Sequence, residues 1–180
     1  HVYLIFDRYY EYSIKSVCRL CRGKAASRHH KLTPLTVLPP QKIGLTVTYN
    51  KVQIINFIVE SLIRQPQDLK QTNHKLVITG PEPVPIEVYQ GLVIHREDMR
   101  NTQEEADVII IHQLLQIVQE YEHCNITVLS DDTDVFILLI YFYHNESLAC
   151  EVRMESTKSS KHSIDIKTTT EKHAEIANEL

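Results

Sequence analysis

The sequence predicts an α/β fold, in which the strands of a central sheet are flanked by helices. Short apolar runs of strand length alternate along the chain with longer stretches whose apolar residues recur at helical spacing. At 180 residues, 43% hydrophobic and 23% charged, the chain is long enough for one domain with a substantial core. We expect a single domain over residues 1–180. Because the chain opens on a strand-like run and stops in a helix-like one, we expect this domain to be incomplete at both termini.

The first strand is expected at Val2 to Phe6, a continuous apolar run typical of a buried parallel strand. It ends on Asp7, at the carboxyl end of the strand, where open α/β sheets bind their ligands. Asp7 also suits a turn or an ion pair with Arg8. Both interpretations of Asp7 remain open from the sequence.

The middle of the chain shows weaker but readable patterns. They predict a short strand at 42–49, a helix from its N-cap Asn50 to Arg64 with Pro66 after it, a strand at 75–79, and a hairpin of 86–89 and 92–95 around Gln90-Gly91.

An acidic helix-then-strand unit follows, from Asn101 to Asp134. Thr102 with Glu105, and Asn101 with Glu104, fit the spacing of a capping box, but capping does not require Asp107 as well. The helix is expected to run to about Tyr121, and a buried strand from Ile126 to Leu129. Ser130-Asp131-Asp132-Thr133-Asp134 then lies at the carboxyl end of that strand. Chain reversal can bring these carboxylates to one rim of the sheet, where they repel one another unless cations bind them. The pattern predicts a divalent-metal site with Asp132 and Asp134 as ligands and Asp131 in support.

The last third of the chain continues the alternation. Val135 to Tyr143 is strand or helix by periodicity, and the Asp-rich start favours a helix. The run of apolar residues there is far shorter than the ~20 residues of a membrane-spanning helix. We also expect strands at 150–154 and 163–166 and a helix from 168 to 180.

Charge is distributed unevenly along a chain of net charge −4. Cations crowd the first 31 residues, where only Asp7 and Glu11 are acidic; they are Arg8, Lys15, Arg19, Arg22, Lys24, Arg28 and Lys31. Residues 10–31 have few helix breakers, so this segment is either a solvated helical face or a surface that grips phosphates, with Tyr9, Tyr10 and Tyr12 available to stack on bases. A basic arm near carboxylates suits a protein that holds polyphosphate beside metal ions.

Cysteine usage points to a reducing, intracellular compartment. The four cysteines, at 18, 21, 124 and 150, do not make a disulfide framework for a chain of this length. Cys18-x-x-Cys21 has metal-ligand spacing and is followed by His29 and His30, but the spacing matches no common zinc finger. Two plain thiols are therefore favoured over a zinc site.

Three acidic motifs, taken together and in this order, resemble those of the flap endonuclease and XPG-like branch of the PIN-like nuclease superfamily. Val2-Tyr3-Leu4-Ile5-Phe6-Asp7 resembles the first strand and its Asp, Glu105-Ala106-Asp107 is similar to the Glu-Ala-Glu that opens a helix, and Ser130 to Asp134 resembles the acidic Asp-x-Asp segment. The resemblance is closest to a branch, often found near mobile elements, that carries Glu-Glu-Ala-Asp and Asp-Thr-Asp-Val. It thins out between residues 32 and 100.

The resemblance implies a mostly parallel sheet with helices on both faces, a Rossmann-like three-layer fold. It implies a nuclease that hydrolyses phosphodiester bonds of branched or single-stranded DNA or RNA with two Mg²⁺ or Mn²⁺ ions. Asp7, Glu105, Asp107, Asp132 and Asp134 would be the catalytic metal ligands. Segment 15–31 lies where the family has its strand-threading arch, so that Arg8, Lys15, Arg19, Arg22, Lys24 and Arg28 would contact nucleic acid.

This sequence departs from the family pattern in three places. Asp107 is one methylene shorter than the usual Glu. The resemblance implies that one family Asp precedes His1 and another follows Leu180, so we expect this chain to carry an incomplete metal site and to lack activity by itself.

Two other functions fit parts of the pattern. One is a non-catalytic nucleic-acid or protein binding module on the same scaffold. The other is a phosphatase of the haloacid dehalogenase type, because Asp132-Thr133-Asp134-Val135 follows an apolar strand and is similar to that family's Asp-x-Asp motif. Phe136 stands where that motif has Thr or Val, which makes the phosphatase the weaker alternative.

Overall fold

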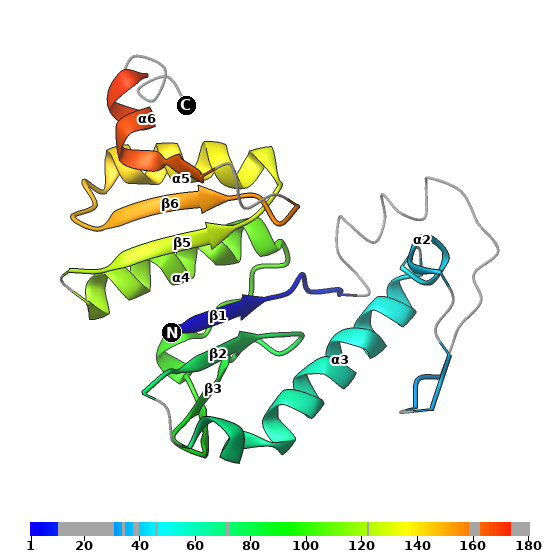
Figure 1. Ribbon diagram of the computed structural model, residues 1–180. Helices are drawn as coiled ribbons and strands as arrows, with labels where there is room; N and C mark the ends of the chain where they lie inside the picture. The colour runs from blue at the N-terminus through cyan, green and yellow to red at the C-terminus, as the bar shows by residue number, and fades with distance from the viewer. Residues whose placement is uncertain are drawn as a thin grey trace. The chain divides into compact units, whose positions relative to one another are not determined.

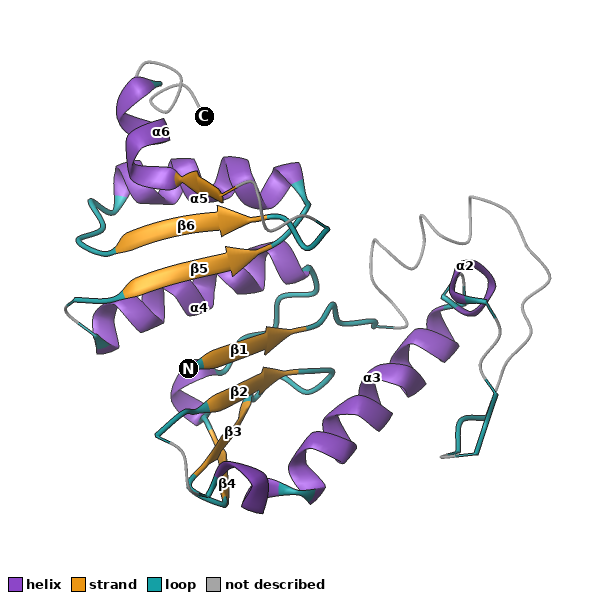
Figure 2. Ribbon diagram, in the orientation of Figure 1, coloured by secondary structure: helices purple, strands orange, loops and turns teal. Residues whose placement is uncertain are grey.

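The computed structural model describes residues 1–10, 31–33, 35–37, 40–45, 47–70, 73–121, 123–158 and 163–173. They belong to two compact units, His1–Ala106 and Asp107–Leu180, each with its own sheet (Figures 1 and 2). Most of the basic segment, with Cys18 and Cys21, lies outside the described residues. The single domain over 1–180 stays a prediction.

The first unit contains a sheet of four strands in the order β1-β2-β3-β4. These are β1 (Val2–Ile5), β2 (Leu76–Thr79), β3 (Ile86–Tyr89) and β4 (Leu92–His95). β1 and β2 are parallel, whereas β3 pairs antiparallel with both β2 and β4. Gln90 and Gly91 have φ angles of 50° and 79°, which a tight hairpin turn requires at both positions. The hairpin predicted from Gln90-Gly91 is confirmed.

The first two helices of the first unit differ from the prediction. The helical elements are α2 (Gln41–Gly44), α3 (Thr48–Arg64), η1 (Pro66–Leu69) and η2 (Glu97–Met99). The strand predicted at 42–49 is wrong, because the Leu45 N–H donates to the Gln41 carbonyl in a helical turn at 3.0 Å. Asn50 is inside α3 rather than its N-cap: it is 3% exposed and its amide donates to the Gly44 carbonyl at 3.3 Å. The Asn50 side chain therefore connects α2 to α3 instead of capping α3.

The second unit alternates helices and strands as predicted. Its elements are α4 (Ala106–Glu120, whose first residue belongs to the first unit), β5 (Asn125–Leu129), α5 (Thr133–Asn145), β6 (Glu151–Glu155), β7 (Ser163–Asp165) and α6 (Ile166–Lys172). β5 and β6 are parallel and joined through α5, and β7 returns antiparallel to β6 (Figure 2). One apolar cluster joins the helices to the sheet; its buried members include Ile111 of α4, Val128 of β5, Leu139 of α5, Val152 of β6 and Ile166 of α6.

The architecture is mixed α/β, with sheets flanked by helices, which confirms the predicted class. The first sheet combines one parallel pair with two antiparallel pairs, and the second combines one parallel pair with one antiparallel pair. The described strands are therefore less parallel than expected, because a hairpin extends one sheet and a short return strand extends the other. No helix in the described ranges is long and apolar enough to cross a membrane.

Asp165 caps the N-terminus of α6, and this cap gives a test of the local structure. Its carboxylate accepts the Thr168 N–H at 2.7 Å, and this hydrogen bond is the main reason that the pKa of Asp165 lies below its usual value. A carboxylate with a lowered folded-state pKa stabilises the protein above its unfolded-state pKa, and that contribution is lost as the pH falls through the folded-state value.

We expect Asp165→Ala to reduce the free energy of unfolding by about 1 kcal/mol at neutral pH, and Asp165→Asn to cost less because Asn also caps helices. The difference between wild type and Asp165→Asn should shrink as the pH falls through the lowered folded-state pKa, because the carboxyl is then protonated in the folded protein. Urea unfolding at neutral pH and over a series of acidic pH values measures these differences. An Asp165→Ala variant as stable as wild type at neutral pH would contradict the cap.

Candidate functional site

Asp7 lies just beyond the carboxyl end of β1, beside the start of α4. Its Oδ1 accepts the Ala106 N–H at 3.0 Å, and its Oδ2 accepts the Tyr9 hydroxyl at 3.4 Å. The Arg8 N–H donates to the Glu104 carbonyl at 2.8 Å. Two stretches that are almost a hundred residues apart thus lie side by side, and Asp7 is next to the Glu104-Glu105-Ala106 segment.

The first turn of α4 is capped differently from expectation. The helix begins at Ala106, so the pair Thr102 and Glu105 does not form the predicted capping box. Asp7, from another element, binds the Ala106 N–H instead. A negative side chain at a helix N-terminus is favoured by the helix dipole. Capping therefore does not explain why Glu104 and Glu105 are both acidic.

Arg8 holds this arrangement together from inside the first unit. Its side chain is fully buried. The guanidinium donates to the carbonyls of Gly80 at 3.1 Å, Asn101 at 3.0 Å, Gln103 at 2.8 Å and Glu82 at 3.0 Å. Burial lowers the pKa of Arg8, while the charges of Tyr10 and Glu82 raise it. An arginine remains protonated under such conditions. The charged guanidinium therefore connects the end of β1 to the β2–β3 turn and to the segment before α4.

The predicted role of Arg8 in nucleic-acid binding does not agree with this position. A buried guanidinium whose donors are taken by main-chain carbonyls has no surface on which to bind a phosphate. Nothing in the local sequence distinguishes such an arginine from a surface one, because all its partners are distant in sequence. The other predicted phosphate contacts, at Lys15, Arg19, Arg22, Lys24 and Arg28, lie outside the described residues.

The second unit carries its carboxylates at the carboxyl end of β5. Asp132 is the N-cap of α5, and its Oδ1 accepts the Asp134 N–H at 2.9 Å. Asp134 is in the first turn of α5, and Asp107 is in the first turn of α4. Figure 1 shows that α4 begins at the end of the unit where β5 finishes and α5 begins.

Asp131 has partners that hold two loops together. It accepts hydrogen bonds from Ser156, at 2.6 Å, and from Thr157, and the Lys158 ammonium is 3.5 Å away. The hydrogen bonds from Ser156 and Thr157 lower the pKa of Asp131. The residue predicted to support a metal thus connects the loop after β5 to the loop after β6.

The predicted ligands do not form a complete cluster within the residues that the structure describes. Among those residues, no three His, Cys, Asp or Glu side chains lie close enough to hold one metal ion. What the structure does bring together is Asp7 with the segment before α4.

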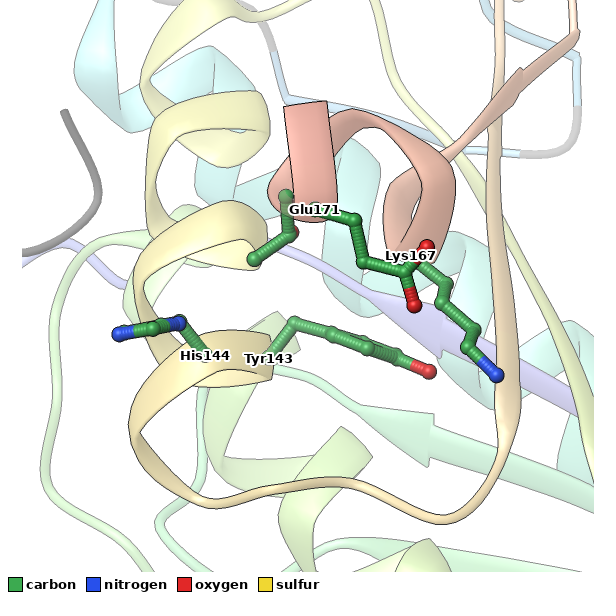
Figure 3. A pocket seen from close by; sticks show the side chains of 5 residues that line it. Tyr143, His144, Lys167 and Glu171 are labelled. Carbon is green, nitrogen blue, oxygen red and sulfur yellow. The ribbon is translucent and has the colours of Figure 1, made fainter. Parts of the chain in front are cut away.

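A pocket of about 380 Å³ lies elsewhere in the second unit, between α5 and α6. Tyr143 and His144 of α5 line it together with Lys167 and Glu171 of α6, and Figure 3 shows the Tyr143 ring extending toward Lys167 while the His144 ring points away from it. It is at the far end of α5 from Asp132 and Asp134. Because its lysine and glutamate carry opposite charges, it has no strong preference for a phosphate, and we do not assign it to the site.

Sequence reasoning missed two features that the structure places clearly: the buried Arg8 and the neighbouring thiols of Cys124 and Cys150. Both depend on contacts distant in sequence.

In comparisons with known proteins, no family model, no curated protein and no solved structure matches this chain.

Proposed function

We propose that this chain belongs to a divalent-metal-dependent nuclease with a PIN-like, three-layer fold, acting on DNA or RNA. The observation that carries the proposal is the hydrogen bond from the Ala106 N–H to Asp7, which sets the carboxylate after β1 beside Glu105. In the proposed function, Asp7, Glu105, Asp107, Asp132 and Asp134 supply the metal ligands. Carboxylate oxygens are the ligands that Mg²⁺ and Mn²⁺ prefer.

The hydrogen bonds around these carboxylates suit ligands that must be held in one orientation. Asp7 is held by the Ala106 N–H and the Tyr9 hydroxyl, and Asp132 by the Asp134 N–H. Such outer contacts orient metal ligands, and a carboxylate that accepts one hydrogen bond keeps further lone pairs for a cation. Bound divalent ions would lower the pKa of a water molecule and stabilise charge on the phosphate. Arg8 acts as a positioning residue, because it follows Asp7 directly, its N–H binds the Glu104 carbonyl and its guanidinium binds the main chain just before Glu104.

Substrate contacts belong to the same proposal. Lys15, Arg19, Arg22, Lys24 and Arg28 would bind the phosphates of a branched or single-stranded nucleic acid by charge. Binding of this kind weakens steeply as the salt concentration rises, whatever the base sequence.

Titration of Mn²⁺ into the chain of 180 residues tests the proposal directly. We expect Asp134→Asn to weaken Mn²⁺ binding at least ~10-fold, because it removes a charged ligand. Glu146→Gln is the matched control: it removes one exposed carboxylate at the other end of α5 and should leave Mn²⁺ affinity unchanged. Circular dichroism checks that both variants fold. Equal Mn²⁺ affinity in wild type and Asp134→Asn would overturn the assignment of the ligands.

A non-catalytic binding module on the same scaffold is the second candidate. It is favoured by the observation that, in the part of the chain that the structure describes, no three ligand side chains gather. Filter binding of single-stranded DNA and RNA with Mn²⁺ and with a chelator separates the two candidates. Nucleic-acid binding without any Mn²⁺ binding would favour the module, whereas Mn²⁺ binding that Asp134→Asn weakens favours the nuclease.

A further inference from the structure

Two cysteines lie directly opposite each other where the parallel strands β5 and β6 begin. Cys124 precedes β5 and Cys150 precedes β6. Asn125 is the register partner of Glu151, and the Glu151 N–H donates to the Cys124 carbonyl at 3.2 Å. The pairing of the strands therefore makes the cysteines cross-strand neighbours, and their Sγ atoms are 2.7 Å apart.

This contact is close for two atoms that are not bonded. Non-bonded carbon atoms stay about 3.5–4.0 Å apart, and sulfur is the larger atom. Both cysteines are free thiols, Cys150 being 2% exposed and Cys124 partly exposed. The backbone thus already holds both sulfurs within reach of each other, which is the main requirement for joining them.

A metal is a less suitable partner for this pair than a second sulfur. Zinc needs four ligands, and within the described residues no third His, Cys, Asp or Glu joins the two thiols.

Burial, followed by the hydrogen bond with Cys150, raises the pKa of Cys124 to about 12. Because the thiolate is the reacting form, the pair should react slowly at neutral pH and faster as the pH rises.

We propose that Cys124 and Cys150 are a redox modification site that closes reversibly into a disulfide by exchange with a small-molecule disulfide. The Cys124 thiol loses its proton to solvent, and its sulfur attacks one sulfur of the small disulfide, releasing one thiol. The Cys150 sulfur, losing its own proton, then attacks Cys124 Sγ and releases the second thiol. Two cysteine thiols are oxidised, and the small disulfide is reduced to two thiols.

The disulfide would enclose the stretch from β5 through α5, which includes Asp131, Asp132 and Asp134. Cross-linking the ends of this stretch restricts the unfolded chain and should make the β5–α5–β6 unit harder to open. Oxidation would therefore stabilise the element that carries these aspartates. This inference does not depend on the proposed nuclease function.

The test uses the whole chain with Cys18→Ser and Cys21→Ser, so that Cys124 and Cys150 are its only thiols. The reduced protein is incubated with oxidised glutathione at pH ~8, where the thiolate is more populated than at neutral pH. We expect intact mass to fall by two hydrogens with no glutathione retained, and maleimide labelling after denaturation to find neither thiol. The midpoint of thermal unfolding should rise on the order of 10 °C and return on reduction with dithiothreitol.

Digestion with trypsin and Glu-C locates the bond, because cleavage after Glu146 leaves two peptides that stay joined only through Cys124 and Cys150. Cys150→Ala is the control and should show no rise in the unfolding midpoint with oxidised glutathione. Two free thiols after long incubation of the wild-type pair, or a stable glutathione adduct on either cysteine, would overturn the proposal. The peptide map of the wild-type pair decides the matter even if Cys150→Ala fails to fold.

Discussion

Replacing Arg8 with Met is expected to reduce the free energy of unfolding by about 3–5 kcal/mol. The guanidinium is fully buried and donates to the carbonyls of Gly80, Glu82, Asn101 and Gln103. Methionine fills a similar volume but has no donor, so these carbonyls would lose a charged partner away from bulk water. Each buried group left without a partner costs about 1–3 kcal/mol. Urea unfolding of wild type and variant measures the difference.

Two further variants separate the causes of this loss. Arg64→Met is the matched control, because Arg64 is 72% exposed and pairs with Glu60 one helical turn away. Its effect should stay within about 0.5 kcal/mol. Arg8→Lys keeps the charge but loses the planar fork, so we expect an intermediate loss. If Arg8→Met is as stable as Arg64→Met, the buried arginine does not hold the unit together.

Hydrogen exchange can report on the same variant near the candidate site. The Ala106 N–H is protected by Asp7, and the Arg8 main chain lies beside Asp7 and is bonded to Glu104. Loss of the Arg8 side chain should therefore speed exchange at Ala106 more than at the hairpin of β3 and β4. Such a result would connect the stability of the unit to the position of the Asp7 carboxylate.

Most helices and strands could be predicted because their signals are local. The turn at Gln90-Gly91 fixed a hairpin, and the acidic start at Asp132 favoured α5 as a helix over a strand. The strand predicted at 42–49 was wrong because a few weakly alternating residues do not distinguish a strand from a helical turn. The N-cap predicted at Asn50 was wrong for another reason: the Asn50 side chain binds the Gly44 carbonyl of a neighbouring helix instead of capping its own helix.

The candidate site was predictable only in part. The place of Asp7 after the first strand could be read from the apolar run before it, but its hydrogen bond with the Ala106 N–H, almost a hundred residues away, could not. The partners of individual side chains could not be read, because they come from distant segments. Asp131 binds the loop after β6, and the Arg8 side chain binds two separate stretches of main chain. Composition and spacing carry no information on such pairs.

Arg96→Met is expected to cost about 2–4 kcal/mol, because it leaves the Glu87 carboxylate buried without its cation. Glu87 is on β3 and its side chain is 7% exposed, while that of Arg96 is 15% exposed, and the two are joined at 2.6 Å. Arg96 also binds Asp98 at 2.7 Å, and this hydrogen bond is the main cause of the lowered pKa of Asp98. Asp98 is 62% exposed, so Asp98→Asn should cost less than about 1 kcal/mol.

The double variant Glu87→Leu with Arg96→Met shows whether the pair stabilises the unit or only avoids a penalty. Apolar replacement of a buried ion pair is often neutral or stabilising, because neither charge then has to leave water. We therefore expect the double variant to recover most of the stability that Arg96→Met loses. The four free energies of unfolding form a double-mutant cycle with a coupling energy of about 1–3 kcal/mol. Additive losses would instead mean that Glu87 and Arg96 act independently, with Glu87 reaching solvent once Arg96 is gone.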